Sequence, residues 1–234
     1  MRVCIIIPMY NEAAIARHSL ETILPYVREL PPVVRVLVVN DGSEDATEQI
    51  VQAVVKEQPD DLVRLVSHPQ NAGYGAALRT GIRYAIDHRY DYALFMDSDL
   101  TNHPKYLKDF YAKMQEGWDY IKATRHSKGG GYHGVPWERR VISRLGNRLA
   151  KVISGLPLND STNGFRAVKI EILKRLELRE NSFAIIIEEL TQSKRYTDSY
   201  CEIPNILGNR SEEARPTSFS YDFRTYWKYF RYLF

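Results

Sequence analysis

The first hundred residues alternate between short apolar runs and longer stretches whose apolar residues recur at helical spacing. The runs are continuous and rich in β-branched residues, which is typical of strands buried on both faces of a parallel sheet. The alternation predicts an α/β fold with a doubly wound, mostly parallel central sheet flanked by helices. The predicted strands lie at residues 3–7, 35–39, 63–67 and 92–96, and the predicted helices at residues 13–28, 43–56 and 76–87.

The second half of the chain is less regular. It predicts a strand at residues 120–124, a glycine-rich loop at 128–134 and a short strand at 200–203. No shift of composition marks a boundary, so residues 1–220 form one predicted domain. Three further helices are predicted at residues 138–154, 170–176 and 183–194.

Residues 221–234 predict a C-terminal amphipathic helix. Such a helix suits a membrane interface, and the alternative is that it packs on the protein's own core. Its aromatic face carries Phe223, Trp227, Phe230 and Phe234, and basic residues lie beside that face at Arg224, Lys228 and Arg231.

Polar motifs follow the first four predicted strands. In an open α/β sheet, ligands bind beyond the carboxyl ends of the strands, so these motifs are expected to share one site. They are Pro8-Met9-Tyr10-Asn11-Glu12, Asp41-Gly42-Ser43, Asn71-Ala72-Gly73-Tyr74-Gly75 and Asp97-Ser98-Asp99.

The Asp97-Ser98-Asp99 motif presents two carboxylates just after a buried strand. Carboxylate oxygens are the ligands that Mg²⁺ or Mn²⁺ prefers, and such a cation bridges to diphosphate oxygens. Asp97 and Asp99 are therefore predicted metal ligands, and the metal would offset charge on a departing nucleoside diphosphate.

The two glycine motifs are predicted to lie close to a nucleotide. Gly42 allows close backbone approach, Asp41 can accept hydrogen bonds from a base or ribose, and Ser43 is the predicted N-cap of the second helix. The segment from Asn71 to Gly75 is not a phosphate-binding P-loop, because no Gly-Lys-Ser/Thr follows it.

Composition excludes several classes of protein. A formal net charge of +3 and the lack of a long basic run argue against a nucleic-acid partner. Cys4 and Cys201 are far apart and indicate reduced core residues rather than a zinc site. No apolar stretch reaches the ~20 residues of a membrane span, and the first apolar run is too short for a signal peptide. We expect a cytoplasmic protein, either free or peripheral at the cytoplasmic membrane face.

The ordered set of four motifs resembles the inverting glycosyltransferases of family 2, which have a GT-A fold. The resemblance implies that Pro8, Tyr10, Glu12 and Asp41 line a nucleotide pocket. Asp97 and Asp99 would meet the ribose and the metal. The other predicted nucleotide-sugar contacts are Asn11, Gly42, Ser43, Asn71, Gly73, Gly75 and Ser98.

Later motifs are similar to the subgroup with dolichyl-phosphate mannose synthase and bacterial polyprenyl-phosphate glycosyltransferases. They are Ala123-Thr124-Arg125, Trp137-Glu138-Arg139-Arg140-Val141-Ile142-Ser143 and Asp160-Ser161-Thr162-Asn163-Gly164-Phe165-Arg166.

In that subgroup, residues matching Arg125, Arg139 and Ser143 hold the acceptor phosphate, and Arg210 matches an arginine near the donor diphosphate. Thr101 stands where the subgroup often has a glutamine as third metal ligand.

A phosphate acceptor also fits simple chemistry. A phosphate monoester is mostly a dianion at neutral pH, so it needs cations to position it and no general base. The sequence thus predicts transfer from a UDP- or GDP-sugar to a polyprenyl phosphate at a membrane surface, with the 128–134 loop as an acceptor-side lid. One alternative is transfer to a glycan hydroxyl, with Glu188 or Glu189 as base. Another is a nucleotide-binding regulator without turnover. The sequence leaves open whether the protein forms a homo-oligomer.

Overall fold

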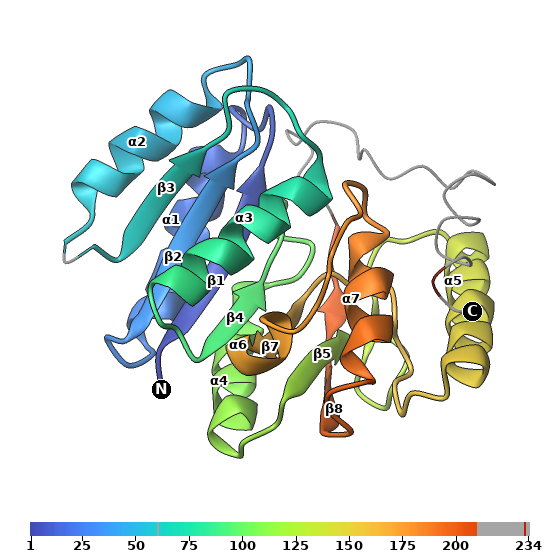
Figure 1. Cartoon of the computed structure of the whole chain (residues 1–234). Coiled ribbons are helices and arrows are strands. Elements are labelled where there is room, and N and C mark those ends of the chain that lie inside the picture. The colour runs from blue at the N-terminus through green and yellow to red at the C-terminus, as the bar shows by residue number, and fades with distance from the viewer. Residues whose placement is uncertain (60, 210–231, 233–234) are drawn as a thin grey trace.

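The computed structural model describes residues 1–59, 61–209 and 232. Its centre is a seven-stranded sheet with the order β3-β2-β1-β4-β7-β5-β8 (Figure 1). All neighbours pair in parallel except β7, which is antiparallel to both β4 and β5. The strands are β1 (Val3–Met9), β2 (Val34–Asn40), β3 (Val63–Ser67), β4 (Tyr92–Phe95), β5 (Tyr120–Thr124), β7 (Arg166–Lys169) and β8 (Tyr200–Pro204).

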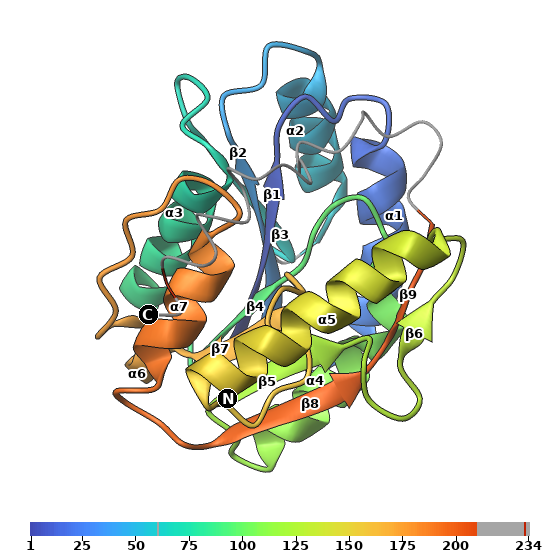
Figure 2. The same ribbon diagram turned by 90° about the vertical axis from the view of Figure 1, so that its right-hand side faces the viewer.

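Helices cover both faces of the sheet, as the alternating pattern predicted (Figures 1 and 2). One apolar cluster joins α1 (Ala16–Arg28), α2 (Thr47–Glu57) and α4 (Leu107–Gln115) to one face. The opposite cluster joins α3 (Tyr74–Asp87), α6 (Ile170–Leu173) and α7 (Ile185–Ser193) to the other. A one-turn 3₁₀ helix, η1 (Pro104–Tyr106), precedes α4.

Strand β1 shows why the continuous apolar runs form buried strands. Successive side chains of a strand point to opposite faces, so an unbroken run supplies both cores at once. Ile5 and Ile7 belong to the α1 side, whereas Cys4 and Ile6 belong to the α3 side, and all four are fully buried.

The antiparallel strand β7 places the functional loops. Because β4 and β5 each pair antiparallel with β7, they run in the same direction as each other. The carboxyl ends of β1, β2, β4, β5 and β8 therefore lie at one edge, together with the segment that enters β7. The pattern of the second half did not predict this strand.

Helix α5 (Trp137–Ser154) stands apart from the two helical layers, on the β8 side of the molecule (Figures 1 and 2). A small parallel sheet of β6 (Gly131–Tyr132) and β9 (Ile206–Leu207) lies near its first turn. The predicted glycine loop thus contains a paired strand.

Three boundary predictions were wrong by three residues or more. Helix α1 begins at Ala16 rather than at residue 13. Helix α2 begins at Thr47 rather than Ser43, because the Ser43 hydroxyl accepts a hydrogen bond from the Asn11 backbone instead of capping the helix. Helix α6 ends at Leu173, three residues early.

No helix within the described residues is long and apolar enough to cross a membrane. The predicted helix at 221–234 lies outside the described part of the chain, except for Tyr232.

Candidate functional site

The loops after β1 and β2 are joined by reciprocal hydrogen bonds. The Asn11 backbone donates to Ser43 Oγ at 2.9 Å, and the Glu44 backbone donates to Asn11 Oδ1 at 2.8 Å. Glu12, which is buried, donates its backbone N–H to Thr47 Oγ1 at 2.8 Å. Asn11 has a φ of 52°, a conformation that asparagine tolerates better than most residues. Asn11 and Ser43 therefore hold the loops after β1 and β2 against each other.

Asp41 holds the loop that leads into α3. Its buried carboxylate accepts the backbone N–H groups of Ala72 and Gly73 at 3.0 and 2.9 Å. Nδ1 of His68 lies 2.7 Å from Asp41 Oδ1, and Nε2 of His68 lies 2.7 Å from the Thr80 hydroxyl. The predicted nucleotide contact is thus also the residue that fixes the Asn71–Gly75 segment.

The glycines near this loop are required by close packing within the chain. A Cβ on Gly42 would lie 2.2 Å from the Gln70 backbone. Cβ atoms on Gly73 and Gly75 would lie 2.5 and 2.1 Å from the carbonyl oxygens of Asn181 and Glu180. These distances are too short for any side chain, so the loop touches residues 180–181 directly.

The acidic pair lies where the sequence predicted it, just past β4. Asp97 Oδ1 accepts the Tyr74 hydroxyl at 3.1 Å, and Asp99 Oδ1 accepts the backbone N–H and hydroxyl of Thr101 at 3.1 and 2.8 Å. Both carboxylates are partly exposed, while Ser98 between them is buried. Tyr74 also stacks on Phe183, with ring centroids 4.3 Å apart.

The carboxylates of Asp97 and Asp99 fit a hard divalent cation that also binds the diphosphate of the donor substrate. Asp97 and Asp99 would supply carboxylate oxygen ligands to such a cation, and the diphosphate of the substrate would supply others. Among the described residues there is no group of three or more His, Cys, Asp or Glu side chains that could hold a metal ion. Thr101 orients Asp99 here, and its role as a third ligand stays a prediction.

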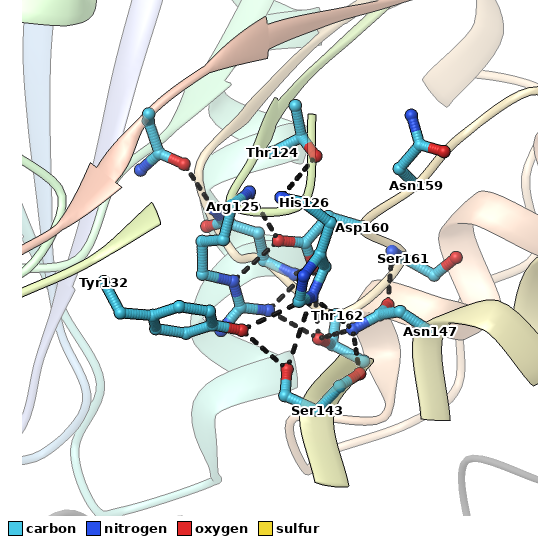
Figure 3. Close-up of polar contacts among 12 residues, drawn as sticks. Thr124, Arg125, His126, Tyr132, Ser143, Asn147, Asn159, Asp160, Ser161 and Thr162 are labelled. Carbon is cyan, nitrogen blue, oxygen red and sulfur yellow. Dashed lines mark hydrogen bonds and ion pairs between the residues drawn. The ribbon is translucent and has the colours of Figure 1, made fainter. Parts of the chain in front are cut away.

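Arg125 lies at the carboxyl end of β5 and forms a forked ion pair with Asp160 (Figure 3). Its Nε and Nη2 donate to the two carboxylate oxygens at 2.6 and 2.7 Å, and Nη2 also donates to Thr162 Oγ1 at 2.8 Å. Burial opposes ionisation of Asp160, but the charge and hydrogen bonds of Arg125 outweigh it and hold the pKa of that carboxyl well below its usual range. These contacts fix the plane of the guanidinium.

Ser143 and Arg125 belong to the same cluster of polar contacts (Figure 3). Its Oγ accepts the Tyr132 hydroxyl at 2.9 Å, and Asn147, one turn further along α5, donates from Nδ2 to the Ser143 carbonyl at 3.0 Å (Figure 3). Arg139 lies on the first turn of α5, and its side chain is outside the described structure, as is Arg210.

The two candidate bases are both engaged in the interior. Glu189 is fully buried in a fork with Arg166, at 2.7 and 2.6 Å, and accepts the Tyr120 hydroxyl at 2.9 Å. Glu188 is also buried and accepts the backbone N–H groups of Arg179 and Glu180. Both carboxylates therefore accept hydrogen bonds from groups within the protein.

The sequence analysis missed His126, Tyr132 and Asn147, which complete the cluster of Figure 3. The sequence held one indication each for His126 and Asn147. His126 follows Arg125 directly, and Asn147 comes four residues after Ser143, so the two polar residues share one face of a helix. Nothing in the local pattern placed Tyr132 near them, because it comes from the separate β6–β9 sheet.

The fold is found in solved glycosyltransferase structures. Glucosyl-3-phosphoglycerate synthase from Mycobacterium tuberculosis, in complex with Mn²⁺, UDP and glucosyl-3-phosphoglycerate, aligns with a TM-score of 0.65 and 23% identity, over 92% of this chain and 73% of that one. The fold class is therefore the GT-A fold.

The model of the glycosyl transferase family 2 matches residues 4–177. Polyprenol monophosphomannose synthase of Mycolicibacterium smegmatis is 32% identical over 177 residues, which make up 76% of this chain and 65% of that protein. Undecaprenyl-phosphate mannosyltransferase of Micrococcus luteus is 32% identical over 178 residues, or 76% and 70% of the two chains. This chain belongs to glycosyltransferase family 2.

Proposed function

We propose that the protein transfers a sugar, with inversion, from a nucleoside diphosphate to a polyprenyl phosphate. The observation that carries this proposal is the arrangement at the acceptor side. Arg125 and Ser143 converge beyond β5, while both candidate bases, Glu188 and Glu189, are engaged in buried contacts. A phosphate acceptor needs groups such as Arg125 and Ser143 to position it, and it does not need a general base such as Glu188 or Glu189. The names of the two 32% identical relatives support the same acceptor class.

In this reaction an oxygen of the acceptor phosphate forms a bond to the anomeric carbon. The bond from that carbon to the diphosphate breaks, and its electron pair stays on the diphosphate. Arg125 and Ser143 orient the attacking phosphate opposite the leaving group. The loops fixed by Asp41 and Asn11 hold the nucleotide.

We further propose that Mg²⁺ or Mn²⁺ binds at Asp97 and Asp99. The cation supplies positive charge beside the leaving diphosphate. Tyr74 and Thr101 each hold one oxygen of these carboxylates, which keeps them oriented before substrate arrives.

The outer surface of α5 supports a site at a lipid surface. Its exposed stripe consists of large apolar side chains, an unusual face for a helix in water. Arg140, Arg144 and Arg148 are exposed next to the stripe and would attract anionic headgroups. The opposite face of the same helix carries Ser143, so an acceptor held by its lipid tail would reach the site. The exposed apolar residues are Trp137, Val141, Ile142, Leu145, Leu149 and Val152.

The test is transfer of labelled sugar into lipid. The purified protein is incubated with Mn²⁺, a polyprenyl phosphate and a panel of UDP- and GDP-sugars, beginning with mannose because both relatives are named for it. Label extracted with the lipid supports the proposal, and mild acid should release the free sugar. Extension of a soluble glycan without lipid product would show the hydroxyl-acceptor alternative, and nucleotide binding without any transfer would show a regulator.

A further inference from the structure

Tyr132 lies between the two side chains that the proposed function assigns to the acceptor phosphate. The Arg125 guanidinium lies over its ring, 5.4 Å from the centroid, and its hydroxyl donates to Ser143 Oγ at 2.9 Å (Figure 3). Arg125 directly follows β5, and Ser143 lies on α5. One residue of a third element therefore contacts both.

The β6–β9 sheet holds Tyr132 in this place. The Gly131 backbone donates to the Asn205 carbonyl at 3.0 Å, and the His133 backbone donates to the Leu207 carbonyl at 2.8 Å. A Cβ on Gly130 would lie 2.5 Å from the Thr124 carbonyl oxygen, so the segment passes directly against the end of β5. The segment that carries Tyr132 is thus packed against the end of β5, directly before Arg125.

His126 contacts the Tyr132 hydroxyl as well. Its Nε2 lies 3.3 Å from the Tyr132 hydroxyl, and its buried Nδ1 has no hydrogen-bond partner within the described part of the chain. A buried N–H without an acceptor is rarer and costlier than a bare lone pair. We therefore assign the proton of the neutral ring to Nε2, from where it can be donated to Tyr132.

Asn147 also lies near this ring, with its Nδ2 3.3 Å from His126 Nε2, and its amide has other partners. Its Oδ1 accepts the Ser161 backbone N–H at 2.8 Å, which fixes the direction of the amide. Its Nδ2 has acceptors at the Ser143 carbonyl and at Thr162 Oγ1, 3.0 and 3.3 Å away. Both amide protons thus have oxygen partners, and neither needs Nε2 of His126.

We propose that His126 and Tyr132 are positioning residues of the acceptor-phosphate site, joined in a donor relay from His126 Nε2–H through the Tyr132 hydroxyl to Ser143. Because Ser143 Oγ accepts from Tyr132, its own proton points elsewhere and can be donated to the phosphate. Donors in such a chain polarise one another, which strengthens the last hydrogen bond to an anion. The inference rests on the proposed function.

The first test is Tyr132→Phe, which keeps the ring beside Arg125 and removes only the hydroxyl. The KM for polyprenyl phosphate should rise about three- to tenfold, the effect of one hydrogen bond, while the donor KM stays unchanged. Tyr196→Phe is the matched control, since Arg175 lies over that ring too, 5.7 Å from the centroid, outside the cluster. A donor KM that rises equally, or an unchanged acceptor KM, would overturn the relay.

Variants of His126 test the order of the relay. His126→Leu should raise the acceptor KM like Tyr132→Phe, and His126→Gln, which retains an N–H donor, should restore most of the loss. The double variant His126→Leu/Tyr132→Phe should be no worse than Tyr132→Phe alone, because both changes break the same chain. Additive effects would show two independent contacts and contradict the proposal.

A binding measurement separates this inference from the proposed function. Farnesyl phosphate is titrated into the wild type and Tyr132→Phe, and the apparent melting temperature is followed. If the wild type makes no lipid-linked sugar but binds farnesyl phosphate more tightly than the variant, the function is wrong and the relay stands. If the wild type transfers sugar and the variant binds equally well, the relay alone is wrong. If the wild type neither transfers nor binds, both are wrong.

Discussion

At the residue scale, neighbouring hydroxyl groups orient the two carboxylates of the acidic pair. Asp97 and Asp99 each have one oxygen occupied by a hydroxyl of the chain, from Tyr74 and Thr101 respectively. A carboxylate held in this way has less freedom to lose when it binds a cation. Tyr74 supplies a neutral donor to Asp97.

Asp99→Asn should abolish most transfer without disturbing the fold. The amide can still accept the Thr101 hydroxyl, but it loses the charge that binds the metal. Metal-assisted charge stabilisation is worth several kcal/mol, so kcat should fall about a hundredfold or more. The measurement is the transfer rate against Mn²⁺ concentration, with Asp109→Asn, an exposed aspartate of α4, as control. An unchanged rate would exclude a metal role for Asp99.

Lys122 is a second residue whose environment makes a prediction. It is fully buried in β5 and donates to the Asn163 carbonyl at 2.6 Å, which holds the loop that carries Asp160. Burial, and then the Arg166 charge, lowers its pKa to about 7.

The unfolded chain keeps this lysine protonated up to about pH 10. Above pH 7 the unfolded chain therefore binds more protons than the native chain. As a result, the contribution of Lys122 makes the free energy of unfolding rise with pH. Lys122→Met should remove up to about 1 kcal/mol per pH unit from this slope between pH 7.5 and 8.5. Urea denaturation at several pH values measures the difference, and parallel pH curves for the two proteins would contradict the assignment.

At the element scale, the parallel half of the fold could be predicted from sequence. In the acceptor half, β5, β8 and α5 were predicted, but β7 and the β6–β9 sheet were not. The strands at residues 3–7 and 35–39 are buried on both faces, so their composition alone identifies them. Strand β7 begins and ends with a charged residue, and Arg166 is buried only because Glu189 of a distant helix neutralises it. Ser143 was found through a resemblance, whereas Tyr132 depends on a pairing of two-residue strands that leaves no periodic pattern.

Most helices on a protein surface bury apolar side chains and expose polar ones, and helix α5 does the opposite. Its inner face buries Asn147 and Ser154, while leucines and valines face outward. The sequence analysis predicted that the segment 221–234 either binds a membrane interface or packs on the core, and that prediction lies outside the described residues apart from Tyr232. Within the described residues, α5 has an exposed apolar and basic stripe.

Leu145→Glu/Leu149→Glu should weaken binding to anionic vesicles strongly, because both side chains are more than half exposed on the stripe. The double change should leave transfer to farnesyl phosphate in solution nearly intact. Co-sedimentation with vesicles containing phosphatidylglycerol measures the binding, which should also weaken with salt. Val33→Glu, an exposed apolar residue just before β2, is the control. Equal sedimentation of double variant and wild type would exclude α5 as the lipid-facing element.

At the scale of the whole molecule, residues 179–181 join the nucleotide half to the acceptor half. The Gly75 backbone donates to the Asn181 carbonyl at 2.9 Å, and Arg79 donates to the carbonyl of Glu180. On the other side, Glu188 of α7 accepts the backbone N–H groups of Arg179 and Glu180. One buried carboxylate thus fixes the segment against which the Asn71–Gly75 loop packs.

This arrangement separates a structural role of Glu188 from a catalytic one. In Glu188→Gln, an amide N–H₂ would face backbone donors, which costs about 1–3 kcal/mol and lowers the melting temperature by several degrees. A general base would behave differently, since its loss lowers kcat by orders of magnitude and removes the acidic limb of the pH profile. We expect lower stability, a nearly unchanged kcat below the melting range and an unchanged pH profile. Glu171→Gln, exposed on α6, controls for the loss of charge. A large loss of kcat at full stability would instead favour a hydroxyl acceptor and a site organised around α7.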